Sequence, residues 1–342
     1  MRRTPAWIAL ACCAAWGAAA FAGPAQDALS PAGPQAAHIH TLWHVMLAVC
    51  TLVFAAVLAA FLIALWRAPR ADAAAPPDLD AALRPERGAR RSVLAAVAAS
   101  TLLLVFLILA SFLTDRALAR LSSENAVRIE VTANQWWWEA KYGDPQPSRT
   151  FTTANELHIP VGRPVVLTLK SSDVIHSFWV PNLHGKRDLI PGRTTVLRLQ
   201  ADRAGAYRGQ CAEFCGFEHA YMAFQLVAEP ADRYEAWAEH QRQSAAEPGD
   251  DTLRRGRELF LTTTCVMCHA IQGTDASARR GPDLTHVGGR RDIAAGTMAN
   301  TDDNLARWIR DPQRFKPGVN MPASNLPEDD LKAIVAYLRS LS

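Results

Sequence analysis

Two long apolar segments, residues 42–66 and 92–113, limit what this chain can fold into more than any other feature. Neither contains Asp, Glu, Lys or Arg, and each is long enough to span the roughly 30 Å hydrocarbon layer of a bilayer as an α-helix. Inside lipid the backbone must satisfy its own hydrogen bonds, so helices are expected there. A buried hairpin of a soluble protein is the alternative, but the length of both segments argues against it. We therefore predict a transmembrane hairpin over residues 38–116.

The flanking sequence predicts which side of the membrane the rest of the chain occupies. Residues 1–22 have the features of a secretory signal peptide, with arginines, an apolar run and small residues near the expected cleavage site. The connector between the two apolar segments is rich in arginine, and short loops of this kind stay in the cytoplasm. Everything after residue 113 is therefore predicted to lie outside the cytoplasm.

A short run near the middle of the chain concentrates residues that bind metals. Residues 211–222 contain Cys211, Cys215, His219 and Met222. Thiolate, imidazole and thioether donors together favour copper over hard cations. Zinc is the main competitor, but structural zinc sites normally use Cys and His without Met. His176, in a strand-like segment upstream, is a second candidate histidine, and two thiolates on one loop can bridge two copper ions.

The residues around this run, 126–228, have the pattern of an all-β domain. Residues 127–132 alternate between apolar and polar side chains, and residues 164–169 have the pattern of a buried strand. A β-sandwich of roughly 100 residues fits this length. Three consecutive tryptophans, Trp136 to Trp138, cannot all face one side of a sheet because successive side chains alternate. At least one of them is expected to be exposed.

A second redox motif follows the predicted sandwich. Cys265, Cys268 and His269 form a C-x-x-C-H sequence, which is typical of a covalently attached c-type haem. The two thiols would form thioethers to the haem edges, and the histidine is placed to take one axial position on the iron. Residues 251–342 are therefore predicted to form a cytochrome c domain, joined to the sandwich by a polar linker at residues 229–250.

The second axial ligand of the iron should lie ahead of the helix predicted from about residue 328 onward, where apolar residues recur with helical spacing. Met321 is the preferred candidate, because Met/His ligation is the usual arrangement in electron-transferring cytochromes c. Met298 and His286 are the alternatives.

With both motifs in view, the chain resembles subunit II of the caa-type haem-copper cytochrome c oxidases, in which a binuclear copper (CuA) domain precedes a fused cytochrome c. The resemblance runs from about residue 38 to the C-terminus. It implies a two-helix anchor, a cupredoxin-like sandwich and an all-α class I cytochrome c domain. It also implies six copper ligands, which are His176, Cys211, Glu213, Cys215, His219 and Met222. Glu213 would bind copper through its backbone carbonyl and place its side chain on a magnesium ion shared with subunit I, and Trp136 would be the point where electrons enter from cytochrome c.

The function implied by this resemblance is electron transfer in respiration. Electrons would pass from soluble cytochrome c or an upstream complex through the haem c and the copper pair to haem a of subunit I, where oxygen is reduced to water with coupled proton translocation. The implied partners are subunit I, which holds haem a and copper B, and subunit III. The implied location is the bacterial inner membrane, with the copper and haem domains on the periplasmic side. The sequence contains no signature of nucleic-acid binding.

The sequence departs from the family pattern in one place and leaves one alternative open. Many members carry a glutamate at the start of the second span that helps load a proton pathway, whereas residues 90–95 contain none and Glu86 is a weak substitute. Quinol oxidase subunits lack the copper ligands, and a nitrous oxide reductase would need a further His-rich catalytic domain. The remaining alternative is a stand-alone, membrane-anchored copper and haem electron carrier.

Overall fold

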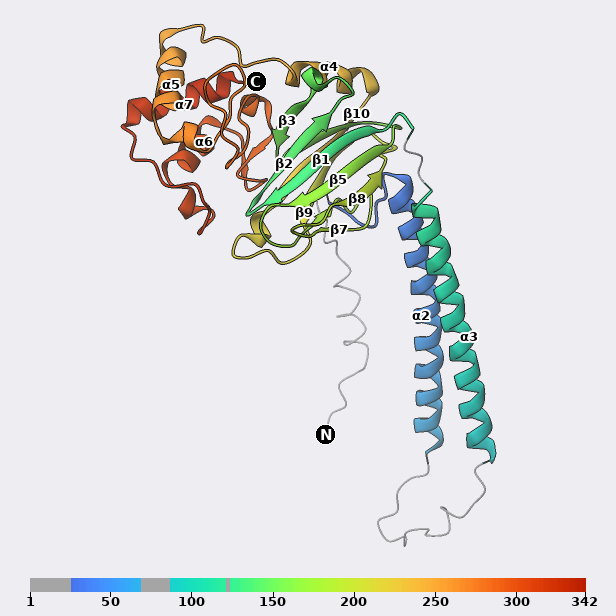
Figure 1. Ribbon diagram of the computed structural model, residues 1–342. Coiled ribbons are helices and arrows are strands. Elements are labelled where there is room, and N and C mark those ends of the chain that lie inside the picture. The colour runs from blue at the N-terminus through green and yellow to red at the C-terminus, as the bar shows by residue number, and fades with distance from the viewer. Residues whose placement is uncertain (1–25, 69–86, 121–123) are drawn as a thin grey trace, which may run out of the picture.

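Three parts follow one another along the chain in the computed structural model, which describes residues 26–68, 87–120 and 124–342 (Figure 1). A pair of long helices comes first, a β-sandwich second and a small helical domain third. The fold class predicted from the sequence is confirmed, except that the last domain also contains a short two-stranded sheet. The predicted signal peptide, most of the arginine-rich connector and Glu86 lie outside the described residues.

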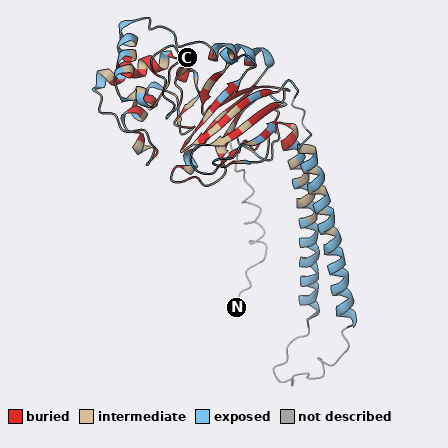
Figure 2. Cartoon of the chain, in the orientation of Figure 1, coloured by how far each residue is buried: buried red, intermediate tan, exposed pale blue. Residues whose placement is uncertain are grey.

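The long helices are α2 (Pro34–Arg67) and α3 (Arg87–Leu118). They lie side by side, and both are long and apolar enough to cross a membrane. None of the residues in their most apolar windows is buried by the rest of the protein (Figure 2). Soluble monomers rarely expose an apolar surface of this size, so the two helices have the surface expected of a membrane anchor. Each extends beyond the apolar segment predicted from the sequence into its polar flanks.

The sandwich consists of two five-stranded sheets, with the strand orders β3-β2-β1-β5-β8 and β4-β10-β9-β6-β7. The strands of the first sheet are β1 (Val127–Asn134), β2 (Trp137–Gly143), β3 (Phe151–Ala154), β5 (Val165–Ser171) and β8 (Thr195–Leu199). Those of the second are β4 (Glu156–Pro160), β6 (His176–Trp179), β7 (Arg187–Leu189), β9 (Gly205–Cys211) and β10 (Ala223–Glu229). β1 and β5 are parallel neighbours inside the first sheet, which confirms both strands predicted from the sequence.

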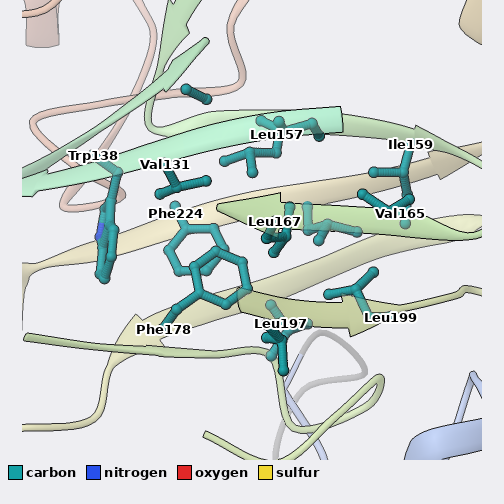
Figure 3. Close-up of a cluster of buried hydrophobic side chains, with 14 of the residues drawn as sticks. Val131, Trp138, Leu157, Ile159, Val165, Leu167, Phe178, Leu197, Leu199 and Phe224 are labelled. Atoms are coloured by element: carbon teal, nitrogen blue, oxygen red, sulfur yellow. The ribbon is translucent and has the colours of Figure 1, made fainter. Parts of the chain in front are cut away.

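Apolar side chains from the facing sheets fill the space between them (Figure 3). Val131 and Trp138 come from the first sheet, and Phe178 and Phe224 come from the second. The Trp138 ring meets these two phenylalanine rings edge on, with centroids 6.0 and 5.1 Å away. Gly209 leaves room for this cluster, because a Cβ atom there would lie 2.1 Å from the Phe224 ring. This core holds β6 and β9, which carry metal-site residues.

The helical domain follows a connecting helix, α4 (Ala231–Gln241). Its main elements are α5 (Asp251–Thr262), β11 (Asp292–Ile293), β12 (Met298–Ala299), α6 (Asp302–Arg310) and α7 (Glu328–Ser340). α5 and α7 cross closely because Gly256 has no side chain, and a Cβ atom there would lie 2.1 Å from the carbonyl oxygen of Ala333. α7 confirms the helix predicted from residue 328.

The helical domain lies against the second sheet of the sandwich. The backbone N–H of Arg291 donates to Glu156 Oε2 at 3.0 Å, and Gln225 Nε2 donates to Asp292 Oδ2 at 2.9 Å. Ala223, at the start of β10, donates its backbone N–H to the carbonyl of Ala295 at 3.0 Å. Residues 291–295 of the helical domain therefore form a continuous contact with the sandwich.

Candidate metal centres

The first candidate centre forms where a strand and a loop of the second sheet meet. β9 ends at Cys211, and the loop from there to β10 carries Cys215, His219 and Met222. His176 is the first residue of β6 and is therefore delivered by a strand that pairs with β9. The backbone N–H of Cys211 donates to the carbonyl of Met222 at 2.9 Å, which closes the loop. Sheet pairing thus brings a histidine from early in the domain to a donor loop from late in it.

The sulfur and imidazole donors of this cluster lie close to one another. The Cys211 and Cys215 sulfurs are 3.8 Å apart, and Cys211 Sγ is 3.8 Å from His176 Nδ1. On the other side, Cys215 Sγ is 3.6 Å from His219 Nδ1 and 3.8 Å from Met222 Sδ. The two cysteines stand at the middle of the cluster, with one imidazole beside each. Two central sulfurs with soft donors around them fit a pair of copper ions.

The two central thiols shift each other's pKa in opposite directions. The hydrogen bond with Cys215 lowers the pKa of Cys211 to about 4. Burial opposes this shift, while hydrogen bonds with His176 and the backbone add to it. The same pairing and burial raise the pKa of Cys215. Thiolates are the form that binds metal, so a bound cation would favour the loss of the second proton.

Asp173 fixes the orientation of the His176 ring. Its Oδ1 lies 2.7 Å from His176 Nε2, which leaves Nδ1 facing Cys211. The same carboxylate accepts backbone N–H bonds from Val174 and Gln135. Burial opposes its charge, but these bonds hold the pKa of Asp173 below its usual value. A carboxylate behind a metal-binding histidine sets the tautomer and ring direction. Sequence reasoning did not identify Asp173. The only feature of the sequence that could have indicated this role is its place three residues before His176.

Glu213 lies on the loop of residues 211–222 between β9 and β10, which we call the copper loop. Its backbone and its side chain have different partners. Its carbonyl oxygen accepts a hydrogen bond from Cys211 Sγ at 3.2 Å, so the carbonyl faces the donor cluster. Its carboxylate instead forms a half-exposed ion pair with Lys186, whose Nζ is 3.2 Å from Oε2. The carbonyl thus lies beside the donor cluster, and both its role as a copper ligand and the magnesium role of the side chain stay predictions.

The second candidate centre surrounds the C-x-x-C-H motif, in a single turn after α5. Cys265 and Cys268 are half-buried, and the backbone N–H of His269 donates to the carbonyl of Cys265 at 3.1 Å. His269 Nδ1 donates to the carbonyl of Pro282 at 2.7 Å, which leaves Nε2 free for an iron. Gly281 is required beside this ring, because a Cβ atom there would lie 2.8 Å from His269 Cε1. Burial lowers the pKa of His269, and the neutral imidazole is the ligand form.

The three candidates for the second axial ligand have different surroundings, and Met321 stays the preferred prediction. Met321 is half-buried on the loop before α7 and packs against the helical-domain core. Gln313 supports that loop by donating from Nε2 to the Met321 carbonyl at 3.0 Å. Met298 sits in β12, paired with Ile293, and packs against the same core. His286 is buried, with Nε2 3.1 Å from the Gln243 carbonyl, so its ring already has a partner.

Comparison with known proteins assigns a family to each of the two domains. Residues 144–229 match the family model described as cytochrome C oxidase subunit II, periplasmic domain, and residues 253–342 match cytochrome c. The chain carries a cytochrome c oxidase subunit II domain followed by a cytochrome c domain. It therefore has a CuA-type donor set, to which His176, Cys211, Cys215 and Met222 belong, and its cytochrome c domain implies a covalent haem c.

Relatives with the name cytochrome c oxidase subunit 2 extend the match beyond one domain. The protein from Alkalihalophilus pseudofirmus is 44% identical over 219 residues, which cover 64% of this chain and 62% of that protein. The protein from Bacillus subtilis is 33% identical over 230 residues, covering 64% and 63%. The chain thus spans somewhat under two thirds of these curated relatives. A solved periplasmic domain of subunit II from Bradyrhizobium japonicum is 28% identical, with a TM-score of 0.32, and covers 34% of this chain and 93% of that one.

The cytochrome c domain covers the tryptophan that the sequence singled out in the subunit II domain. Trp136 is only 8% exposed. Its Nε1 donates to the carbonyl of Cys215 at 3.0 Å, and a Cβ atom on Gly318 would lie 3.9 Å from its Cη2. The expectation of an exposed tryptophan is wrong: Trp138 is also buried and Trp137 is half-buried. Alternation holds within β2, where Trp138 is buried and Trp137 is half-buried. Trp136 precedes the strand, and its ring packs into the core of the subunit II domain with Gly318 of the cytochrome c domain beside it.

Proposed function

We propose that this chain is the electron-accepting subunit II of a caa-type cytochrome c oxidase in a bacterial cell membrane. It would take electrons from soluble cytochrome c or an upstream complex and relay them to haem a of subunit I, which reduces oxygen to water with proton translocation. Subunits I and III would be its membrane partners. Both redox domains would lie on the periplasmic side. The observation that carries this proposal is the docking of the cytochrome c domain over Trp136, beside the copper loop.

The haem c and the copper pair supply one-electron redox chemistry when bound. Cys265 and Cys268 would hold the haem covalently, and His269 and Met321 would hold the iron from its two faces. Cys211 and Cys215 would hold the copper ions, together with His176, His219, Met222 and the Glu213 carbonyl. The Glu213 carboxylate, now paired with Lys186, would bind magnesium only when subunit I supplies the remaining oxygen ligands.

Trp136 is the side chain placed to connect the two domains. Its ring lies beneath Gly318 of the cytochrome c domain, and its Nε1 hydrogen-bonds the backbone of the ligand Cys215. The covalent link between domains keeps the donor at a local concentration of roughly millimolar. The chain would therefore deliver electrons within one molecule, and external cytochrome would meet the haem-bearing domain first.

The test is purification of the complex from membranes in mild detergent. We expect haem a absorbance to remain with this chain, and oxygen consumption to depend on added cytochrome c. The Cys215→Ser variant should keep the haem a subunit and lose the oxygen consumption. Isolation of the chain with copper and haem c but without a haem a subunit would instead identify a stand-alone electron carrier.

A further inference from the structure

A lysine of the cytochrome c domain is buried where the two domains meet. Lys316 follows α6 in the chain and is only 2% exposed. Its Nζ lies 3.0 Å from the Trp136 carbonyl, 2.9 Å from the Tyr221 carbonyl and 3.3 Å from the Ala294 carbonyl. An ammonium group has three hydrogens to donate, so each can meet one of these oxygens. Lysine is almost never fully buried without such partners.

The three acceptors come from both domains. Trp136 and Tyr221 belong to the subunit II domain, the first before β2 and the second directly before Met222 of the copper loop. Ala294 belongs to the turn between β11 and β12 of the cytochrome c domain. One side chain therefore joins the tryptophan segment, the copper loop and its own domain.

A buried carboxylate lies near enough to Lys316 to favour its charged form. Glu218 of the copper loop is also buried, at 4% exposure, and its charge counteracts the effect of burial on Lys316. Burial lowers the pKa of Lys316 to about 8, which leaves the amine mostly charged at neutral pH. Hydrogen bonds from a charged donor are stronger than neutral ones. A lysine buried by chance would lack this ring of acceptors.

The residues after Lys316 complete the cover over Trp136. Gly318 has φ +91°, a conformation that favours glycine, and it passes over the indole ring. Val319 packs against the core of the subunit II domain. The segment continues directly to Met321, the preferred axial ligand. The position of Lys316 therefore sets the position of the loop that would carry a haem ligand.

We propose that Lys316 is the positioning residue that fixes the cytochrome c domain over Trp136 and the copper loop, and that it thereby sets the rate of electron transfer from haem to copper within the chain. This inference rests on the proposed function of the two centres. Small displacements of reacting groups are costly to rate, and three hydrogen bonds from one buried ammonium restrict such displacement. Lys316 itself would touch neither haem nor copper.

The test uses the purified complex with haem and copper bound, and it measures internal electron transfer from haem to copper after rapid reduction of the haem. In Lys316→Met we expect this rate to fall by ~10-fold or more, the effect of removing charge-assisted hydrogen bonds at an interface. The haem absorption spectrum and the copper resonance should stay unchanged. Lys316→Arg should recover part of the rate. Lys332→Met, an exposed lysine on α7 of the same domain, is the matched control and should behave as wild type.

Three further outcomes are decisive. An unchanged transfer rate in Lys316→Met overturns the inference. If that variant assembles without haem or copper, Lys316→Gln replaces it. Its amide has two donor hydrogens and no charge, so it cannot serve all three carbonyls, and an unchanged rate there overturns the inference equally. Absence of internal transfer in the wild-type complex would instead count against the proposed function itself, so the two failures are distinguishable.

Discussion

The indole nitrogen of Trp136 donates a hydrogen bond of 3.0 Å to the backbone carbonyl of Cys215, a central residue of the copper donor cluster. Gln135 donates from Nε2 to the same carbonyl at 2.8 Å. The segment before β2 is thereby joined twice to the copper loop. A side chain in this position can transmit a change in the cytochrome c domain to the metal-binding backbone without being a ligand.

The first prediction tests that link. Trp136→Phe keeps an aromatic ring but removes the Nε1 donor, so we expect a loss of about 1 kcal/mol in the free energy of unfolding. Internal electron transfer to copper should slow while the copper resonance keeps its shape. Stopped-flow spectroscopy and thermal unfolding measure the two effects. Trp137→Phe, at the half-buried neighbour, is the control. Equal transfer rates in both variants would remove Trp136 from the route.

The second prediction concerns the central thiols. Because Cys211 and Cys215 each neighbour the other and an imidazole, replacing either by serine should abolish the mixed-valence copper pair. Met222→Leu should be milder, since it removes one thioether at the edge of the cluster and should retain copper with an altered potential. Copper content and electron paramagnetic resonance measure this. A wild-type copper signal in Cys215→Ser contradicts the assignment.

The copper donor set and the haem-attachment motif could be recognised from the sequence because each is short-range or chemically distinctive, whereas the second axial ligand of the haem stays a prediction. The run from Cys211 to Met222 holds most of the copper cluster within one loop, and the haem motif is contiguous. Only His176 had to come from elsewhere, and sheet pairing places it correctly. Periodicity likewise predicted β1 and α7, because each has a clear apolar face, and a continuous apolar run predicted the buried strand β5.

The contacts between domains were not predictable in the same way. Lys316 looks like an ordinary surface lysine in the sequence, because nothing local indicates that another domain will cover it. Trp136 illustrates the same limit, because it precedes β2 and strand alternation does not predict that its ring packs between the copper loop and Gly318 of the cytochrome c domain. Such relationships depend on tertiary and interdomain packing, which a single sequence does not encode locally.

The third prediction separates the two domains. A chain ending after Glu247 should lose all covalent haem and keep its copper, because none of the proposed ligands is shared. The same truncation removes residues 291–319, so it should also expose Trp136, which is 8% exposed in the whole chain. We expect stronger quenching of tryptophan fluorescence by a soluble quencher. Covalent haem staining in the shortened chain would contradict the assignment of the haem motif.

The fourth prediction distinguishes the axial methionines. Met321→Leu should eliminate the weak sulfur-to-iron absorption band in the red and lower the haem potential, because thioether ligation favours the reduced iron. Met298→Leu is the control, since that residue sits in the β11–β12 hairpin, and it should leave both properties nearly unchanged. Loss of the band in Met298→Leu alone would reverse the choice while keeping the cytochrome c domain.

The last prediction concerns a buried histidine between two carboxylates. His158 lies with Nε2 3.0 Å from Glu156 and Nδ1 3.0 Å from Glu229, and its ring stacks on Trp237 with centroids 4.1 Å apart. Burial opposes its charge, but the two carboxylates outweigh burial and raise the pKa of His158 above its usual 6.5. Glu156 also accepts the backbone N–H of Arg291 from the cytochrome c domain, so this cluster adjoins the domain interface.

Because the pKa of His158 is raised in the folded state, its charged ring stabilises the fold fully below about pH 6.5. This stabilisation is lost as the pH rises through the folded-state pKa. The two glutamates have lowered pKa values, so their contribution is lost in acid, as pH falls below about 4.5. Stability should therefore be greatest between these limits.

In His158→Gln the decline in unfolding temperature above neutral pH should flatten, whereas His38→Gln, at an exposed position, should keep the wild-type profile. An identical pH profile in His158→Gln and the wild type would show that this pairing does not control the stability of the domain.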